Sequence, residues 1–234
     1  MQPLGYSTGA IALSDFRRAL EMLKDQPVQA VELSAIREQE LVPLLSSLND
    51  LDLSQFSYVS IHAPSSFSPE AEARIFQKLY SIRHRGWPIV VHPDALYDFS
   101  LWRKLGDLLC IENMDKRKPA GRTLKELELL FDEFPEASFC FDIGHARQVD
   151  TSMTEAFRML KRLRPRLRQV HISEVNTRNK HDRLSFVSIL GFQEVTHLIP
   201  DSTPVIIESI VTQDQIGAEI SRAQTALHAT AEAQ

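Results

Sequence analysis

Leu109-Cys-Ile-Glu112 is a short apolar run that ends in a carboxylate, and Ser138-Phe-Cys-Phe-Asp142 repeats this pattern one helix later. Between the two runs, Thr123-Leu-Lys-Glu126 has the spacing of a helix capping box, and Pro135 marks the end of the helix that it opens. Residues 109–142 therefore predict a strand, a helix and a second strand, which is the repeating unit of a parallel sheet.

The same alternation runs through the whole chain. Eight β-rich apolar runs are separated by segments of helical period, and the runs are Leu4–Ser7, Ala30–Leu33, Tyr58–His62, Ile89–His92, Leu109–Glu112, Ser138–Asp142, Gln169–Ile172 and Val205–Glu208. Dividing the 234 residues by eight gives about 29, the length of one strand-helix unit. The sequence predicts an α/β fold, a single (β/α)8 TIM barrel domain over residues 1–234. An open doubly wound sheet is the alternative, but no glycine-rich nucleotide loop follows the first run.

The segments between the runs carry helix signals of unequal strength. Ser68-Pro69 predicts an N-cap followed by proline in the first turn, and Ser152-Met-Thr-Glu155 has the spacing of a second capping box. The segment from Ser185 to Ile199 contains Gly191 at its centre. A break in the seventh helix is therefore expected there.

Composition limits the classes of partner. With 43% hydrophobic and 24% charged residues, the chain has the make-up of a globular protein, and its formal net charge of −5 offers no overall attraction to nucleic acid or anionic lipid. We therefore expect neither a nucleic-acid nor a membrane partner. The two cysteines lie in apolar runs and no signal segment is recognisable, so a cytoplasmic protein without disulfides is expected. A homo-oligomer is compatible with the sequence.

Chemistry in such barrels lies at the carboxyl ends of the strands. The residues at or beside these ends are Glu32, His62, His92, Glu112, Asp142, His171 and Glu208. Carboxylates packed this closely would repel one another, and a divalent cation is the usual means of keeping them ionised. Oxygen and imidazole ligands without thiolate suit Mn, Mg, Co or Zn. The expected cofactor is a divalent metal ion, with no nucleotide cofactor.

The strand pleat predicts what lies beneath these residues. Side chains two positions earlier point the same way, which assigns Ser60, Val90, Cys110, Cys140, Gln169 and Ile206 to the barrel interior. The cysteines are then core residues, and Gln169 becomes a candidate hydrogen-bond partner for a metal ligand. Glu32 is interpreted in the same way, as a structural partner in the mouth rather than a ligand.

Several of these motifs, in this order, resemble those of the xylose-isomerase-like TIM barrels. This superfamily joins sugar phosphate isomerases and epimerases to the apurinic endonucleases of the endonuclease IV type, also called AP endonuclease family 2. The resemblance spans essentially the whole chain. It is carried by Ser60-Ile-His62, Val91-His92-Pro93, Ile111-Glu112-Asn113, Phe141-Asp142-Ile-Gly-His145, Val170-His171-Ile-Ser-Glu174 and Ile207-Glu208-Ser209.

The resemblance implies a shared metal site formed by Glu112, Asp142, His171 and Glu208. In the epimerase branch the two glutamates also form the acid/base pair. The endonuclease branch adds a second metal on histidines that match His62 and His92, with Glu112 bridging, although these histidines could instead orient substrate.

The third metal of the endonuclease branch implies a further set of residues. His145 matches its first histidine. Asn179-Lys-His181 matches an Asp-x-His pair in which asparagine replaces the anionic ligand. In the other branch, the segment from His171 to Arg178 is similar to the substrate loop of ketose 3-epimerases. Glu174 and Arg178 are therefore candidate substrate-binding residues, with one extra residue before the arginine.

Two reactions follow as expectations. The first is a metal-dependent sugar or hydroxy-carbonyl isomerase or epimerase, in which Glu112 and Glu208 transfer protons and the substrate is a sugar or sugar phosphate. The alternative is a multi-metal phosphodiester hydrolase of the AP-endonuclease kind, favoured by His62 and His92. Basic residues after the fifth run, Lys116-Arg-Lys-Pro-Ala-Gly-Arg122, form either a solvated loop or a sugar-phosphate anchor. A barrel that binds without turnover is a third class.

Overall fold

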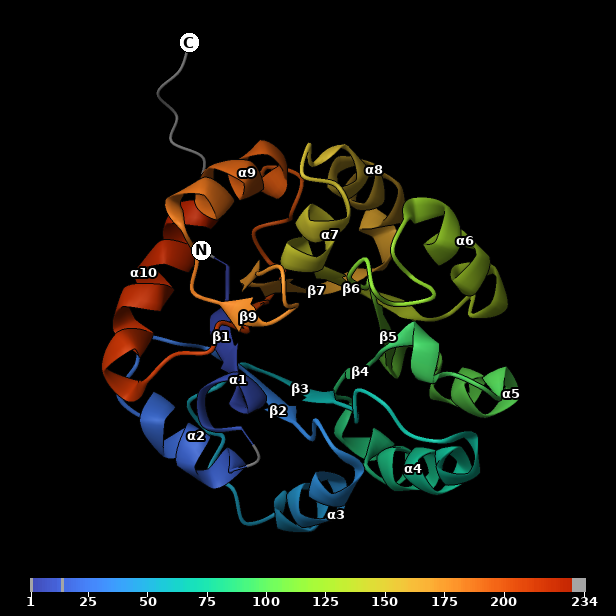
Figure 1. Ribbon diagram of the computed structural model, residues 1–234. Helices are drawn as coiled ribbons and strands as arrows, with labels where there is room; N and C mark the ends of the chain where they lie inside the picture. Colours follow the sequence, from blue (N-terminus) through green and yellow to red (C-terminus); the bar gives the residue numbers. More distant parts are fainter. Residues whose placement is uncertain (1, 14, 229–234) are drawn as a thin grey trace.

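The computed structural model describes residues 2–13 and 15–228, and a closed barrel of parallel strands lies at its centre (Figure 1). Over these residues the barrel strands are β1 (Leu4–Ser7), β2 (Ala30–Ser34), β3 (Tyr58–His62), β4 (Ile89–Val91), β5 (Leu109–Glu112), β6 (Ser138–Asp142), β7 (Leu167–Ile172) and β10 (Val205–Ile207). β10 closes the barrel by pairing in parallel with both β1 and β7. The predicted (β/α)8 barrel is confirmed.

Helices surround the barrel (Figure 1). The outer helices are α2 (Phe16–Leu23), α3 (Glu38–Ser47), α4 (Pro69–Ser81), α5 (Phe99–Trp102), α6 (Leu124–Glu133), α8 (Thr154–Leu163), α9 (Phe186–Thr196) and α10 (Ile216–Leu227). Short 3-10 turns lie at Arg83–Arg85, Pro93–Ala95, Arg103–Leu108, Arg164–Arg166 and Gln213–Gln215. None of the described helices is long and apolar enough to cross a membrane.

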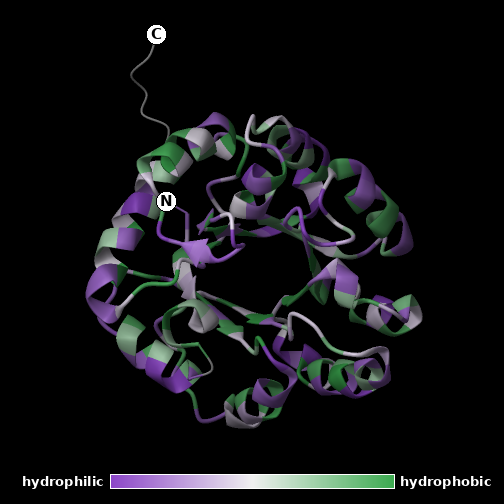
Figure 2. Cartoon of the chain, in the orientation of Figure 1, coloured by the Kyte–Doolittle hydropathy of each residue, from purple (hydrophilic) through white to green (hydrophobic). Residues whose placement is uncertain are grey.

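The helices form where capping and amphipathic spacing coincide. In α2, Ala19 and Leu23 are fully buried, and the Asp15 side chain caps the first turn by accepting a hydrogen bond from the Arg18 amide at 3.0 Å. Thr123 caps α6 in the same way through the Glu126 amide. In Figure 2 hydrophilic and hydrophobic residues alternate along the helices, as expected where one face packs on the barrel and the other meets solvent.

Two details of the helix predictions are wrong. α8 begins at Thr154, one residue later than the predicted capping box, because Met153 adopts a left-handed backbone (φ 59°). Asp150 supplies the cap there by accepting from the Glu155 amide at 2.9 Å. Gly191 does not break α9. A β-carbon at Gly191 would lie 3.0 Å from Nε of Arg147, so this glycine makes room for a neighbouring side chain.

The barrel has two apolar regions. A large cluster of buried side chains fills the space between the strands and the helices. Inside the barrel, Val90, Cys110 and Cys140 form a small separate cluster, as the pleat predicted, and both cysteines are free thiols. This interior layer is the floor beneath the carboxyl ends of the strands.

Extra elements lie at the carboxyl ends of three strands. α1 (Thr8–Ala12) follows β1 directly, and α7 (Ile143–Val149) follows β6. After β7 the chain forms an antiparallel hairpin of β8 (Glu174–Val175) and β9 (His181–Asp182). These elements bring side chains to the mouth that the barrel strands alone do not supply.

Candidate metal centre

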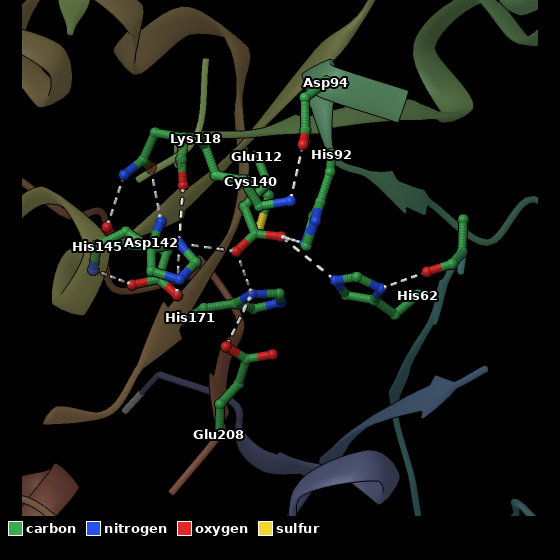
Figure 3. A network of polar contacts seen from close by, with 12 residues as sticks. His62, His92, Asp94, Glu112, Lys118, Cys140, Asp142, His145, His171 and Glu208 are labelled. Carbon is green, nitrogen blue, oxygen red and sulfur yellow. Dashed lines mark hydrogen bonds and ion pairs between the residues drawn. The ribbon is translucent and has the colours of Figure 1, made fainter. Parts of the chain in front are cut away.

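Eight of the predicted site residues meet at the mouth of the barrel. Figure 3 labels all of them except His181. They are His62, His92, Glu112, Asp142, His145, His171, His181 and Glu208. Six of them lie in or directly after barrel strands, whose carboxyl ends converge. His145 is carried by α7 and His181 by β9.

Glu112 is the centre of this group, and only 1% of its surface is exposed. Its Oε2 lies 3.3 Å from Nε2 of His62 and 3.3 Å from Nε2 of His92. Its Oε1 lies 3.4 Å from Nδ1 of both His145 and His171. Each carboxylate oxygen therefore faces two imidazoles. Nδ1 of His145 also lies 3.0 Å from the Asn113 carbonyl oxygen and so carries its hydrogen, which leaves His62, His92 and His171 as the imidazoles that could share a cation with Glu112.

Hydrogen bonds orient two of these imidazoles. Nδ1 of His62 lies 2.7 Å from the Ala63 carbonyl oxygen, which can only accept, so Nδ1 carries the hydrogen and Nε2 is left to face Glu112. Nε2 of His171 lies 2.9 Å from a carboxylate oxygen of Glu32, so its Nδ1 is the free nitrogen. In the neutral imidazoles both free nitrogens present lone pairs to a carboxylate. Either a proton on the imidazole or a bound cation must therefore lie between them.

Asp142 brings a second buried carboxylate to the same space. Its Oδ1 accepts from the His145 amide at 2.6 Å, whereas Oδ2 is buried without a hydrogen bond and lies 3.3 Å from Nδ1 of His145. The Asn113 side chain holds the backbone of Asp142 through two 2.8 Å hydrogen bonds, one to the carbonyl and one from the amide. This positioning role of Asn113 was not predicted, although the residue lies directly after Glu112. An orphaned carboxylate oxygen in a buried polar site fits a metal ligand.

Four sets of potential ligands share residues, and one of them, Glu32 with His62 and Glu208, includes the carboxylate that was expected to be a structural partner. His62 and His92 form one set with Glu112; Glu112, Asp142, His171 and Glu208 form the second; Asp142, His145 and His181 form the third. Within each set the ligand atoms lie within 4.8 Å of one another. Nitrogen and oxygen donors without thiolate fit Mn, Mg, Co or Zn, so the residues present are suited to divalent ions.

The charges at the mouth shift the pKa values of its groups strongly. Burial, together with the charges of Glu112 and Asp142, raises the pKa of Glu208 to about 8 against the opposing effect of His171. Burial alone would lower the pKa of His62, but its hydrogen bond to Glu112 and the surrounding carboxylates raise it to about 9. Glu112 is buried too, yet the neighbouring imidazoles hold its pKa well below the usual value. Protons on imidazoles thus balance the carboxylates in the absence of metal.

A buried polar chain supports His171 from below. Gln169 donates from Nε2 to Oε2 of Glu32 at 2.8 Å, and the Tyr58 hydroxyl donates to Oε1 of Gln169 at 2.6 Å. Glu32 and Gln169 thus act as the hydrogen-bond partners that the pleat predicted, and Tyr58 is an addition. Hydrogen-bonded carboxylates of this kind fix the tautomer and ring orientation of metal-binding histidines.

The ligand sets open into a pocket of about 290 Å³. Arg117 and Lys118, from the basic loop after β5, line this pocket, and Nζ of Lys118 lies 2.8 Å from Oδ2 of Asp94. Nε of Arg117 lies 3.5 Å from Oδ1 of Asp115, which also lines the pocket, so each basic side chain at this edge is paired with a carboxylate. An anionic substrate group would compete with these carboxylates for the two cationic side chains.

The remaining predicted residues lie elsewhere. Oε2 of Glu174 accepts from the Ser185 amide at 2.9 Å, at the start of α9. Glu174 and the exposed Arg178 are both absent from the described lining of the mouth pocket. Asn179 donates to Asp115 and Gln148 instead of joining the set of His145 and His181. The third ligand set therefore has a single carboxylate, which it shares with the second.

No protein-family profile and no curated protein matches the sequence. Solved structures do match the fold. A xylose isomerase domain protein from Alicyclobacillus acidocaldarius subsp. acidocaldarius is 11% identical, with a TM-score of 0.67 over 97% of this chain and 98% of that chain. A xylose isomerase-like TIM barrel protein from Mycobacterium smegmatis, solved in complex with magnesium, is 12% identical, with a TM-score of 0.59 over 97% and 98%.

A third solved structure is a proposed sugar phosphate isomerase/epimerase from Anabaena variabilis. It is 14% identical, with a TM-score of 0.57 over 94% of this chain and 88% of that chain. At these identities the likeness shows the fold. The chain shares the (β/α)8 barrel fold of these structures.

Proposed function

We propose that the protein is a multi-metal hydrolase that cleaves a phosphoester bond in a small substrate. The observation that carries the proposal is the placement of Glu112, whose two oxygens each face two imidazoles. A carboxylate held in this way can bridge a pair of cations. Metal pairs about 3.5–4 Å apart are typical of phosphatases and nucleases.

Different side chains have different roles in this proposal. His62 and His92 hold one ion with Glu112, while Asp142, His171 and Glu208 hold the other. When bound, such ions supply Lewis-acid activation of water and of a phosphoryl oxygen. Arg117 and Lys118 bind the anionic group at the edge of the pocket in place of their carboxylate partners. Glu112 itself holds no proton, because imidazoles surround both of its oxygens and keep its pKa low.

The dimensions of the mouth favour a small substrate. The pocket measures about 290 Å³, and the formal net charge of the chain is −5. A protein that binds nucleic acid gains most of its affinity from basic side chains that replace counterions along the phosphate backbone. Two basic side chains at the pocket are enough for one phosphoryl group. The site therefore suits a small phosphoester better than a DNA duplex.

An isomerase or epimerase is the second candidate, and Glu208 favours it. Its side chain is 13% exposed and its pKa is raised to about 8, mainly by burial, as a general acid near neutral pH requires. The description of the Anabaena variabilis structure points to the same reaction class. The enclosure of Glu112 among imidazoles weighs against this candidate, because it removes Glu112 from the expected pair of proton-transferring carboxylates.

Two assays on the metal-loaded protein separate the candidates. We expect Mn²⁺-loaded or Zn²⁺-loaded protein to release p-nitrophenol from p-nitrophenyl phosphate or its diester. Asp142→Asn should abolish release, and Asp132→Asn, at an exposed position on α6, should retain it. No release from either ester, together with deuterium incorporation from solvent into a ketose phosphate, would favour the isomerase and contradict the proposal.

A further inference from the structure

The mouth pocket has an apolar wall that the ligand sets do not use. Its apolar lining residues are Gly9, Ala10, Leu13, Ile36, Met114 and Ile210. Leu13 follows α1 after strand β1, Ile36 follows β2 and Ile210 follows β10. These three strands are adjacent in the barrel, so the three large side chains occupy one continuous sector of the rim.

Large apolar side chains in this sector face open space. Leu13 is 61% exposed, Ile36 38% and Ile210 51%, although each lines the pocket. Leu13 also has a positive φ of 53°, a conformation that glycine or asparagine adopts at lower cost. Exposed apolar groups gathered at a concave site indicate a surface that becomes buried on binding.

Close packing at Ile36 and a backbone hydrogen bond at Ile210 connect this wall to the rest of the mouth. A β-carbon at Gly9 would lie 2.7 Å from Cδ1 of Ile36, so Gly9 allows α1 to lie directly against that side chain. The Ile210 amide donates to the carbonyl of His181 at 3.0 Å. The apolar wall is thus attached to the same loops that carry the ligand sets.

The opposite edge of the pocket is basic. Arg117 and Lys118 lie on the loop after β5, across the barrel from the sector of β10, β1 and β2. The pocket therefore has two ion-paired basic side chains on one edge and ligand side chains on its floor. On the other edge, the three apolar side chains lie above Ser7 and Ser34 at the ends of β1 and β2. A polyhydroxylated substrate would leave hydroxyl groups without hydrogen-bond partners against the apolar wall.

We propose that the substrate is a phosphoester of an apolar alcohol, with an aromatic or branched aliphatic group that packs on Leu13, Ile36 and Ile210. This inference rests on the proposed phosphoester hydrolase function. It adds a substrate class to that function, because the apolar wall selects the group bound to the phosphoryl oxygen. A sugar phosphate is the alternative that the apolar wall disfavours.

Binding of two phosphonates to the Mn²⁺-loaded protein tests this proposal by calorimetry. Phenylphosphonate and methylphosphonate share the anionic group and differ in the apolar group. Burying a phenyl ring on the apolar wall should make phenylphosphonate bind about tenfold or more tightly. Leu13→Ser and Ile210→Ser should each reduce this ratio, and the double variant should bring it close to one.

Leu129→Ser is the matched control, because Leu129 on α6 is 63% exposed and outside the pocket. It should keep the wild-type ratio, and circular dichroism checks that every variant is folded. Equal affinity of the wild type for both phosphonates would overturn the apolar subsite and leave the hydrolase proposal standing. A ratio that survives in the double variant would also overturn it. Binding of neither phosphonate would overturn the subsite and the hydrolase proposal together.

Discussion

Nε2 of His171 lies 2.9 Å from Oε2 of Glu32, and both residues are fully buried in the barrel. The Glu32 carboxylate accepts the imidazole hydrogen and so leaves Nδ1 of His171 pointing at Glu112 and Glu208. A residue from β2 therefore determines which nitrogen of a β7 residue stays free of a hydrogen-bond partner below it. Such partners raise the basicity of the ligand and fix its orientation.

Replacing Glu32 should weaken metal binding without removing a ligand. In Glu32→Gln the charge opposite His171 is lost, and we expect the affinity for Mn²⁺ to fall by about 10–100-fold. Calorimetric titration of metal-free protein measures this change. Glu21→Gln removes an exposed carboxylate on α2 and should bind Mn²⁺ like the wild type. Unchanged affinity in Glu32→Gln would show that the pair has no role in metal binding.

Loss of Glu112 should affect both neighbouring ligand sets, whereas loss of His62 should affect one. Loss of a hydrogen-bond partner of a metal ligand costs up to roughly 100-fold in activity. Because Glu112 is itself a proposed ligand, Glu112→Gln should lower the rate of hydrolysis by more than this. His62→Asn should reduce the metal content by one ion per chain. Elemental analysis after dialysis and the p-nitrophenyl phosphate assay give the two readings. A Glu112→Gln variant with full metal content and activity would contradict the bridging role.

The metal-free protein should become less stable as the pH rises above neutrality. Despite burial, carboxylates raise the pKa of His62 to about 9 and of His145 to about 10, above the unfolded value of 6.5. Their stabilisation is complete below pH 6.5 and is lost as the pH rises through the folded pKa. Burial raises the pKa of Glu208 from 4.5 to about 8. Ionisation of this carboxyl therefore also lowers the stability of the fold as the pH rises above 4.5.

Thermal unfolding in a chelator between about pH 6.5 and about pH 8.5 measures this effect, and we expect the melting temperature to fall. Added Mn²⁺ should stabilise the protein more at the higher pH, because ligand imidazoles must be deprotonated. A melting temperature that rises over this range in the chelator would contradict the assigned charge states.

Gly5 tests how closely the barrel strands are packed. A β-carbon at Gly5 would lie 1.8 Å from the backbone oxygen of Ala30 in the paired strand β2. Gly5→Ala should therefore destabilise the protein by about 3 kcal/mol or more, at or above the upper end for overpacked cores. Gly86→Ala is the control. Its positive φ of 68° costs about 1–2 kcal/mol, but nothing lies within 4 Å of the added carbon. Urea unfolding measures both.

The strands and their terminal residues were predictable because the barrel imposes a regular repeat on the chain. β3, β5 and β6 have the predicted bounds, and their last residues His62, Glu112 and Asp142 lie at the mouth as expected. Carboxyl ends of parallel strands converge in any such barrel, so position in the strand was enough to bring these side chains together.

Contacts between side chains of different helices and loops could not be predicted from local sequence patterns. Gly191 has the appearance of a helix break, yet it accommodates Arg147 from a different helix. His181 reaches the mouth only because residues 174–182 form a hairpin, for which no alternating pattern gave a signal. The apolar rim at Ile36 and Ile210 was also unpredicted. Its members come from separate loops and share a surface only once the barrel closes.

The number of divalent ions bound per chain tests the central proposal most directly. Protein reconstituted with Mn²⁺ or Zn²⁺, dialysed and analysed by mass spectrometry should retain two ions, one on each ligand set that includes Glu112. The third set should bind more weakly, because Asp142 is its single carboxylate and is shared. Anomalous scattering should place the two ions on either side of the Glu112 carboxylate. One ion per chain, held by Glu112, Asp142, His171 and Glu208 alone, would contradict the multi-metal hydrolase.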